Sequence, residues 1–177
     1  LGEFLYGLGR VRQRTPPAGL YETTSRPYRN GGASYELELY PIVDRCQGLL
    51  PGFYHYDPEE HALEPLARPN ALTEQFLEDA RVFSGQSVRP EILFMIAARF
   101  GRVSWKYASI AYATILKNVG ALYQTMYLVA TSMRLAPCAL GAGNSDRFSQ
   151  LLGEDYYRET AVGEFMLGNL PTSLPPG

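Results

Sequence analysis

The chain has 177 residues, of which 46% are hydrophobic and 19% are charged, a composition typical of a folded domain and not of a disordered segment. Its net charge of −2 at pH 7 offers no electrostatic attraction to nucleic acid or to an anionic membrane, so we expect neither as a partner. The length fits one domain, and we expect a single domain over residues 1–177.

Nothing in the sequence indicates secretion or membrane insertion. The first ten residues lack the basic start and the cleavage site of a signal peptide. The longest apolar run is interrupted by Lys117, Asn118 and Gln124, which argues against a membrane span. We therefore expect a cytoplasmic protein.

The first half of the chain predicts a short helix, a loop and a strand. The helix is amphipathic and ends near Gly9, and residues 13–30, with three prolines and no periodicity, predict a loop or linker. Residues 34–43 alternate in polarity, as a half-buried strand does. Its two faces would carry Tyr35, Leu37 and Leu39 on one side and Glu36, Glu38 and Tyr40 on the other. Pro41 predicts that the far end of this strand lies at an edge or a bulge.

The next elements follow from turns and apolar runs. Residues 52–66 predict a β-hairpin, residues 73–83 a helix, and the apolar run at 91–98 a strand buried on both faces. A short strand near 136–140, a glycine-rich turn, a helix at 145–152 and a strand at 161–168 end the pattern. Because strands and helices mix without a regular βαβ repeat, the predicted class is α+β.

A long helix lies between these strands and is apolar nearly all round. One side repeats at intervals of three and four residues and comprises Ile115, Val119, Leu122, Met126, Val129 and Met133. The other side comprises Tyr112, Leu116, Tyr123, Tyr127 and Ala130. Such a helix is central, and we expect a sheet to cover one side and a second subunit the other.

Common catalytic and nucleotide-binding motifs are missing from the sequence. There is no GxGxxG or GxxxxGK[ST] pattern, and two histidines make a Ser–His–Asp triad improbable. Two glycine turns, at 28–34 and 140–145, adjoin strands, where backbone N–H groups could face a ligand, although most such turns are only turns. His55 and His61 lie near three acidic residues, but a solvated hairpin explains this group better than a metal site, and we expect no metal.

Lys106 and Tyr107 are the better candidates for chemistry. They follow a buried strand and a turn, at the expected start of the long helix, a place where open sites collect. The lysine charge and a helix N-terminus would both favour the phenolate, so the pair could act as a general base near neutral pH. Spacing alone favours a plainer reading, in which Trp105 and Tyr107 pack and Lys106 is solvated.

Several segments together resemble the SagB/ThcOx-type dehydrogenases of the FMN-dependent nitroreductase superfamily. Members read like RPYPSGGARYPLELY, followed by a GLYHYDP…HALE hairpin, and this chain has RPYRNGGASYELELY (Arg26–Tyr40) and GLLPGFYHYDPEEHALEPL (Gly48–Leu66). WKY, VGALYQTMYLVAT, APCALGAGNSD and GEFMLG follow in the same order over nearly the whole chain. The resemblance implies a nitroreductase-like fold, with a mixed or antiparallel sheet around a long central helix, and a homodimer with FMN at the subunit interface.

The resemblance also implies an activity and its residues. The catalytic pair would be Lys106 and Tyr107, and the FMN-binding residues would be Arg26, Asn30, Gly31, Gly32, Ala33, Gln124, Leu140, Gly141, Ala142 and Gly143. Characterised members oxidise thiazolines and oxazolines to azoles in peptides or in related assembly-line products. The expected partners are therefore an azoline-containing peptide or carrier-bound substrate and a cyclodehydratase or larger synthetase.

Three departures from the family pattern bear on cofactor binding. Asn30 replaces a serine, and Asn118 replaces an acidic residue that often stands two positions before the helix glycine. The Arg-x-Ser-x-Arg element that grips the FMN phosphate is absent, and Arg10, Arg12, Arg14 or Arg26 could compensate for it. The alternatives are another flavin oxidoreductase, which reduces nitro compounds or quinones, and a scaffold protein that kept the fold without the cofactor.

Overall fold

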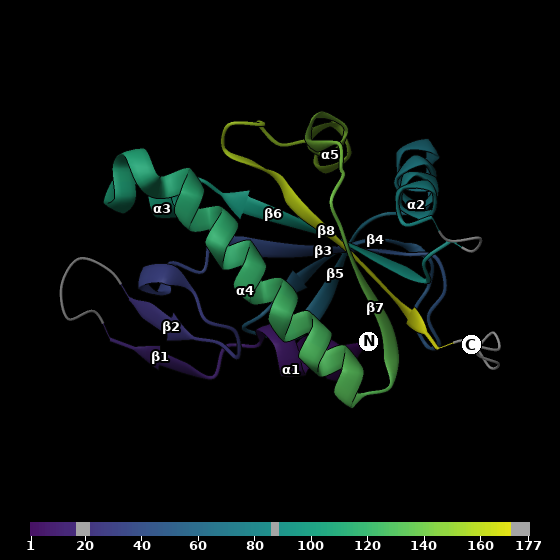
Figure 1. Ribbon diagram of the computed structural model, residues 1–177, viewed down its shortest axis with the longest axis horizontal. Helices are drawn as coiled ribbons and strands as arrows, with labels where there is room; N and C mark the ends of the chain where they lie inside the picture. The colour runs from purple at the N-terminus through teal and green to yellow at the C-terminus, as the bar shows by residue number, and fades with distance from the viewer. Residues whose placement is uncertain (17–21, 86–88, 171–177) are drawn as a thin grey trace.

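A computed structural model of the chain describes residues 1–16, 22–85 and 89–170 (Figure 1). At its centre is a six-stranded sheet in which all neighbouring strands run antiparallel. The strand order is β5 (Ala62–Ala67), β4 (Gly52–Asp57), β3 (Leu37–Val43), β6 (Ile92–Arg99), β8 (Glu159–Asn169) and β7 (Leu135–Leu140). The predicted α+β class is confirmed, and the sheet is antiparallel.

Helices cover both faces of this sheet, as Figure 1 shows. α4 (Ala111–Ser132) crosses one face together with α1 (Gly2–Gly9), and α2 (Ala71–Phe83) and α5 (Ser145–Leu152) lie on the other. Ile115, Leu122 and Met126 of the predicted apolar seam are at most 1% exposed between α4 and the sheet. The prediction that the sheet covers one side of the long helix is therefore confirmed, and a second subunit on the other side stays a prediction.

Local signals explain most of the element boundaries. The Asn70 side chain accepts hydrogen bonds from two N–H groups of the first turn of α2, and Asn144 accepts one from the Arg147 N–H in α5. Residues 92–98 of β6 are buried on both faces, as their apolar run predicts. The predicted hairpin is formed by β4 and β5.

β3 forms where a strand was predicted, but the expectation of one exposed face is wrong. Every residue of β3 is buried, because strands flank it on both sides and helices lie over both faces. The acidic residue Glu38, only 4% exposed, is tolerated there since it pairs with His55 of β4 and Arg99 of β6. Because ion pairs allow an acidic residue inside the sheet, the sequence of β3 alternates in polarity as if one of its faces were exposed to solvent.

Pro41 was expected at an edge or a bulge. The edge is wrong, since β3 lies in the interior of the sheet, but the bulge agrees with a register shift between Phe53 and Tyr54 of the neighbouring strand β4. Pro41 stands opposite Phe94 of β6. On the other side, the register of β3 with β4 consists of Ile42 opposite Phe53 and Val43 opposite Gly52, and it stops just before Pro41 is reached. A proline can occupy this interior strand because no ladder partner in β4 stands opposite it.

The loop or linker expected at 13–30 contains a small hairpin. β1 (Gln13–Thr15) pairs antiparallel with β2 (Thr23–Ser25), and Arg14 stands opposite Thr24. Residues 17–21 of the expected loop lie outside the described residues. Both strands are exposed or half-buried, so they carry no apolar alternation from which a strand could be predicted.

The long helix begins later than the sequence suggests. A separate short helix, α3 (Gly101–Tyr107), and a 3-10 turn, η2 (Ala108–Ile110), precede α4. The backbone of Ala108, with φ of +42°, separates the two helices. Lys106 and Tyr107 therefore end one helix and do not begin another.

No helix in the described ranges combines the length and the apolarity that a membrane span would require.

Candidate functional site

The first glycine turn lies directly against the lysine–tyrosine pair. Residues Gly31–Ala33 form a 3-10 turn, η1, in which Gly32 has φ of +68°. A Cβ atom on Gly32 would overlap the Tyr107 hydroxyl and would lie 3.1 Å from the Lys106 Nζ. Glycine is required here both by the backbone conformation and by the space. The fold thus brings together two segments that are distant in the sequence and that were predicted to share a site.

The electrostatic surroundings of Tyr107 differ from the prediction. Tyr107 is the last residue of α3, where the helix dipole presents its negative end, so the expected help from a helix N-terminus is wrong. The Lys106 Nζ lies 5.6 Å from the centroid of the Tyr107 ring. The positive charge near Tyr107 is therefore that of Lys106, and the helix end adds none.

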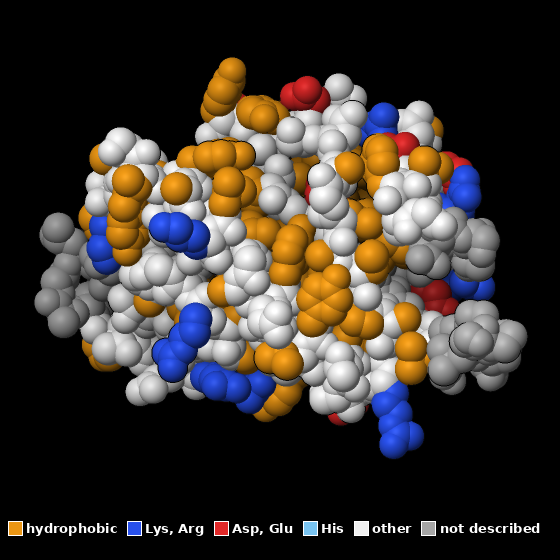
Figure 2. All heavy atoms as spheres, viewed as in Figure 1, with side chains coloured by type: hydrophobic (Ala, Val, Ile, Leu, Met, Phe, Trp, Pro, Cys, Tyr) orange, Lys and Arg blue, Asp and Glu red, His pale blue; other side chains and the backbone are white. Residues whose placement is uncertain are grey.

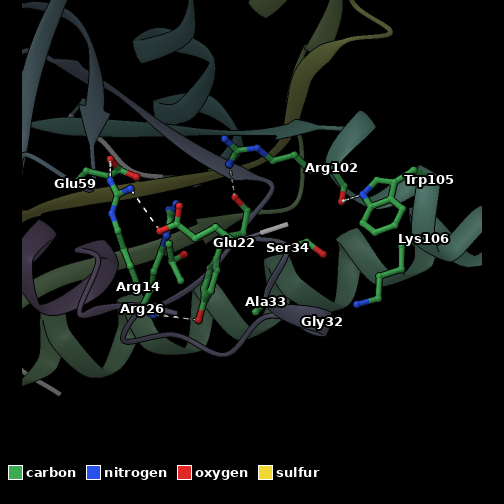
Figure 3. Close-up of a pocket in the computed structure, with 12 residues that line it drawn as sticks. Arg14, Glu22, Arg26, Gly32, Ala33, Ser34, Glu59, Arg102, Trp105 and Lys106 are labelled. Carbon is green, nitrogen blue, oxygen red and sulfur yellow. Dashed lines mark hydrogen bonds and ion pairs between the residues drawn. The ribbon is translucent and has the colours of Figure 1, made fainter. Parts of the chain in front are cut away.

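A cavity of about 320 Å³ opens beside this contact (Figure 3). The β1–β2 hairpin lines one side of it, and the Gly32–Tyr35 segment and α3 line the other. The side chains that define its character are Arg14, Arg26, Arg102, Trp105 and Lys106. Arg102 and Trp105 were not predicted. The i, i+4 spacing of Arg102 and Lys106 would have indicated a shared helix face had α3 been foreseen.

The three arginines of the cavity differ in how their charge is compensated. Arg14 pairs with both Glu22 and Glu59, and Arg102 lies 3.3 Å from the buried carboxylate of Glu38. Among the described residues, Arg26 has no ion pair, and its buried Nε has no hydrogen-bond partner. Its guanidinium instead lies 4.9 Å from the centroid of the Tyr35 ring. Arg26 is therefore the arginine of this cavity best able to take an anionic group of a ligand.

Asn30, also predicted to bind the cofactor, directs its side chain into the protein. Its Nδ2 donates to Glu36, and its Oδ1 accepts from the Tyr35 N–H. Asn118 of α4 reaches the same turn, where its Oδ1 accepts from the Gly31 N–H at 2.9 Å. The sequence marked positions 30 and 118 as departures from the family pattern, and the structure places both at the base of one turn.

The second glycine turn lies elsewhere in the chain. Leu140–Gly143 starts at the last residue of β7, and Leu140, Ala142 and Gly143 line a separate, small depression next to Glu164 of β8. A Cβ atom on Gly143 would fall on the Glu164 carboxylate, which is 9% exposed. Burial raises the pKa of that carboxyl group to about 7. Gln124 is on an exposed side of α4. A single chain therefore does not bring the two predicted glycine turns into one cavity.

The histidines of the β4–β5 hairpin belong to a polar network. His55 contacts Glu38 at 3.0 Å and Glu64 at 3.3 Å, so it is not simply solvated as expected. Burial by itself would lower the pKa of His55, but the two carboxylates outweigh it and raise that pKa above its ordinary value. No group of three or more histidine, cysteine, aspartate or glutamate residues in the described part of the chain could hold a metal ion.

Comparison with known families identifies the class of protein. Residues 30–169 match the model of the Nitroreductase family, and the chain belongs to that family. The match includes the Gly31–Ala33 and Leu140–Gly143 turns and the lysine–tyrosine pair. Members of the family are oxidoreductases and typically bind a flavin.

Two curated relatives show detectable sequence similarity. Protein MJ1384 of Methanocaldococcus jannaschii, named as a nitroreductase, is 28% identical over 70% of this chain and 61% of its own length. The microcin B17-processing protein McbC of Escherichia coli is 31% identical over 62% of this chain and 42% of its own length. The chain thus spans less than two thirds of each relative.

Solved structures share the fold. An Anabaena variabilis protein named as a nitroreductase superposes with a TM-score of 0.81, at 24% identity, over 94% of this chain and 34% of that chain. A chain of the Escherichia coli microcin synthetase McbBCD complex, with truncated pro-MccB17 bound, superposes with a TM-score of 0.72, at 23% identity, over 96% of this chain and 62% of that chain. These similarities confirm the predicted nitroreductase-like architecture.

Proposed function

We propose that this chain is the FMN-binding domain of an oxidoreductase that dehydrogenates thiazoline or oxazoline rings to thiazoles or oxazoles in a peptide natural-product pathway. The observation that carries the proposal is the contact between the Gly31–Ala33 turn and the Lys106–Tyr107 pair in a member of the Nitroreductase family. The similarity to McbC, a microcin B17-processing protein, supports a role in a peptide natural-product pathway. The full protein would be a cytoplasmic enzyme.

The residues present fit a flavin mononucleotide. Gly32 and Ala33 of the turn line the cavity, and so does Arg26, which makes no ion pair among the described residues. Arg26 would hold the phosphate. The Leu140–Gly143 turn would contact the flavin ring, where small residues permit close approach.

We propose that a second copy of the chain completes this site. The two glycine turns line different depressions of one chain, so a flavin that contacts both needs turns from two subunits. Figure 2 shows hydrophobic side chains gathered over α4. They include Tyr112 (62% exposed), Leu116 (44%) and Leu128 (62%), which a homodimer would cover.

The chemistry of ring oxidation assigns a role to each residue of the pair. Azole formation removes two hydrogens from adjacent carbons, and the α-hydrogen is acidic because it lies beside the C=N bond. Tyr107 would take this proton, and the positive charge of Lys106 would stabilise the phenolate or orient the substrate. A bound flavin supplies the acceptor for the hydride that leaves the β-carbon. Dioxygen would finally accept both electrons and give hydrogen peroxide.

The structure of the McbBCD complex supports a proposal for the partners. That assembly contains McbC-like architecture together with a bound pro-peptide. We expect this protein to act on an azoline-containing peptide or carrier-bound substrate, delivered by a cyclodehydratase or larger synthetase that forms the ring.

The similarity to MJ1384 favours a second candidate function, the reduction of nitro compounds or quinones. Both candidates require bound flavin, so the test compares substrates on FMN-loaded protein. The proposal predicts that an azoline peptide loses two hydrogens per ring in air, as measured by mass spectrometry. Reduction of nitro compounds or quinones by a nicotinamide donor, with no azoline turnover, would favour the second function. A protein that binds no FMN would be a scaffold.

A further inference from the structure

We propose that Asn30, Glu36 and Asn118 form a positioning cluster that fixes the Gly31–Ala33 turn against Lys106 and Tyr107. These three residues do not face the cavity and are not catalytic. Their role in turnover rests on the proposed function, whereas their effect on the turn does not depend on it.

A fully buried carboxylate is the centre of the cluster. Glu36 precedes β3 and is 0% exposed. Its Oε1 accepts a hydrogen bond from the Asn118 Nδ2 at 2.7 Å, and its Oε2 accepts one from the Asn30 Nδ2 at 2.9 Å. Burial of a carboxylate is costly, so the two amide donors and the local structure that holds them must offset it.

The cluster continues into the backbone of the turn. The Asn118 Oδ1 accepts from the Gly31 N–H at 2.9 Å, and the Asn30 Oδ1 accepts from the Tyr35 N–H at 3.0 Å. The N–H groups at both ends of the turn are therefore held by side chains that Glu36 orients. Ala33 (φ +52°), which lies between these two N–H groups, and Tyr35 (φ +42°) have left-handed backbones, which are unfavourable for residues other than glycine. Without the cluster, such a turn would relax.

The direction of each hydrogen bond makes the carboxylate essential. Each asparagine presents its oxygen to a backbone N–H, so each must present its NH₂ group to Glu36. A carboxylate satisfies both because it only accepts. A glutamine at position 36 would place its own NH₂ group against the NH₂ group of one of the two asparagines. The cluster therefore depends on acceptor capacity and not on side-chain size.

The sequence pattern agrees with this geometry. Two departures from the family pattern, Asn30 and Asn118, contact Glu36, which stands where that pattern has proline. In this chain the carboxylate comes from the residue before β3 instead of from the helix. The arrangement predicts that a carboxylate at position 118 could replace the one at position 36.

The test is a double-mutant cycle of Glu36→Gln and Asn118→Asp. In the double variant, the introduced aspartate can accept from the Gly31 N–H and from the amide of the introduced glutamine. The oxygen of that glutamine accepts from Asn30, so all donors are matched.

Glu36→Gln alone should weaken FMN binding about tenfold or more, the size of a lost hydrogen bond to a charged group. Asn118→Asp alone places two carboxylates close together. The loss of FMN affinity in this variant should therefore become smaller as pH falls. The double variant should regain most of the wild-type affinity.

A second readout needs neither FMN nor substrate. Trp105 is the single tryptophan of the chain and lines the same cavity as Gly32. Acrylamide quenching of its fluorescence should change in Glu36→Gln and return in the double variant, with Glu60→Gln, an exposed glutamate, as the unaffected control. If the effects of the two single substitutions on FMN binding and on quenching simply add in the double variant, the proposed positioning cluster is refuted. Restored quenching and FMN binding without azoline turnover would leave the cluster intact and refute the proposed substrate instead.

Discussion

The Tyr107 hydroxyl lies against Gly32, where a Cβ atom would overlap it. This contact ties the end of α3 to a turn that begins far earlier in the chain. It is possible only because residue 32 is a glycine with a left-handed backbone. The relative position of the proposed base and the proposed cofactor-binding turn therefore depends on the absence of a Cβ atom at residue 32.

Gly32→Ala should displace Tyr107 and abolish most azole formation. The added Cβ meets the hydroxyl, and φ of +68° disfavours alanine, so we also expect a loss of about 1–3 kcal/mol in the free energy of unfolding. Gly101→Ala is the matched control, because a Cβ at this first residue of α3 meets no atom within 4 Å. Equal activity in the two variants would show that the contact has no functional role.

Arg26→Ala should weaken the binding of FMN but not of riboflavin, which lacks the phosphate. A hydrogen-bonded charge pair with phosphate contributes roughly 1.5–3 kcal/mol, so FMN affinity should fall by about 10- to 100-fold. Flavin fluorescence titration measures both ligands. Arg158→Ala, which removes a largely exposed arginine side chain, serves as the control. An equal loss for FMN and riboflavin would place the phosphate elsewhere.

Glu164→Gln should remove a pH dependence of stability. Burial raises the pKa of this carboxyl group from 4.5 to about 7 in the folded protein. Between these values the folded state holds a proton that the unfolded state has lost, so stability falls as pH rises, by about 3 kcal/mol in total. The glutamine variant should match the wild type near pH 4.5 and exceed it above pH 7.

Urea unfolding at several pH values measures this difference. The raised pKa of His55 also makes the wild type less stable at higher pH, but this contribution is the same in the variant and cancels in the comparison. Glu60→Gln, a substitution at an exposed glutamate, should leave the pH profile unchanged. A constant difference between Glu164→Gln and wild type at all pH values would refute the assignment.

Leu128→Glu should dissociate the proposed homodimer. Leu128 is 62% exposed on α4 in one chain, and a charge there would be buried in the interface. Light scattering after gel filtration measures the mass. Leu50→Glu tests a leucine that is 79% exposed away from α4, and it should leave the mass unchanged. A wild-type monomer that binds FMN fully would contradict the two-subunit site.

The sequence predicted the α+β class, the order of the main elements and the proximity of the two site segments. The errors in the strand predictions arise because apolar periodicity reveals neither the partners of buried polar groups nor strands without a buried face. Glu38 looked solvent-exposed because its ion pairs with Arg99 and His55 come from other strands. The β1–β2 hairpin has no buried face, so it left no pattern.

The sequence predicted that the Gly31–Ala33 turn, Lys106 and Tyr107 belong to one candidate site, but not Arg102, Trp105 or the geometry. Short α3 was merged with α4 because the separating residue, Ala108, is an alanine in an unfavourable backbone conformation, and not the glycine or proline that marks a break. Because of this error, Tyr107 was predicted at the N-terminus of a helix, whereas it lies at the C-terminus of α3. The inward direction of Asn30 also depended on a buried Glu36 that local alternation placed on an open strand face.

The most direct test of the central claim separates FMN binding from azole formation in Tyr107→Phe. The substitution removes the proposed base and keeps the ring, so FMN content should equal that of the wild type. Azole formation should fall by about 100-fold or more, the usual contribution of a general base. Tyr157→Phe, at a tyrosine that is 84% exposed, is the control and should retain full activity. Unchanged azoline turnover by Tyr107→Phe would contradict the account.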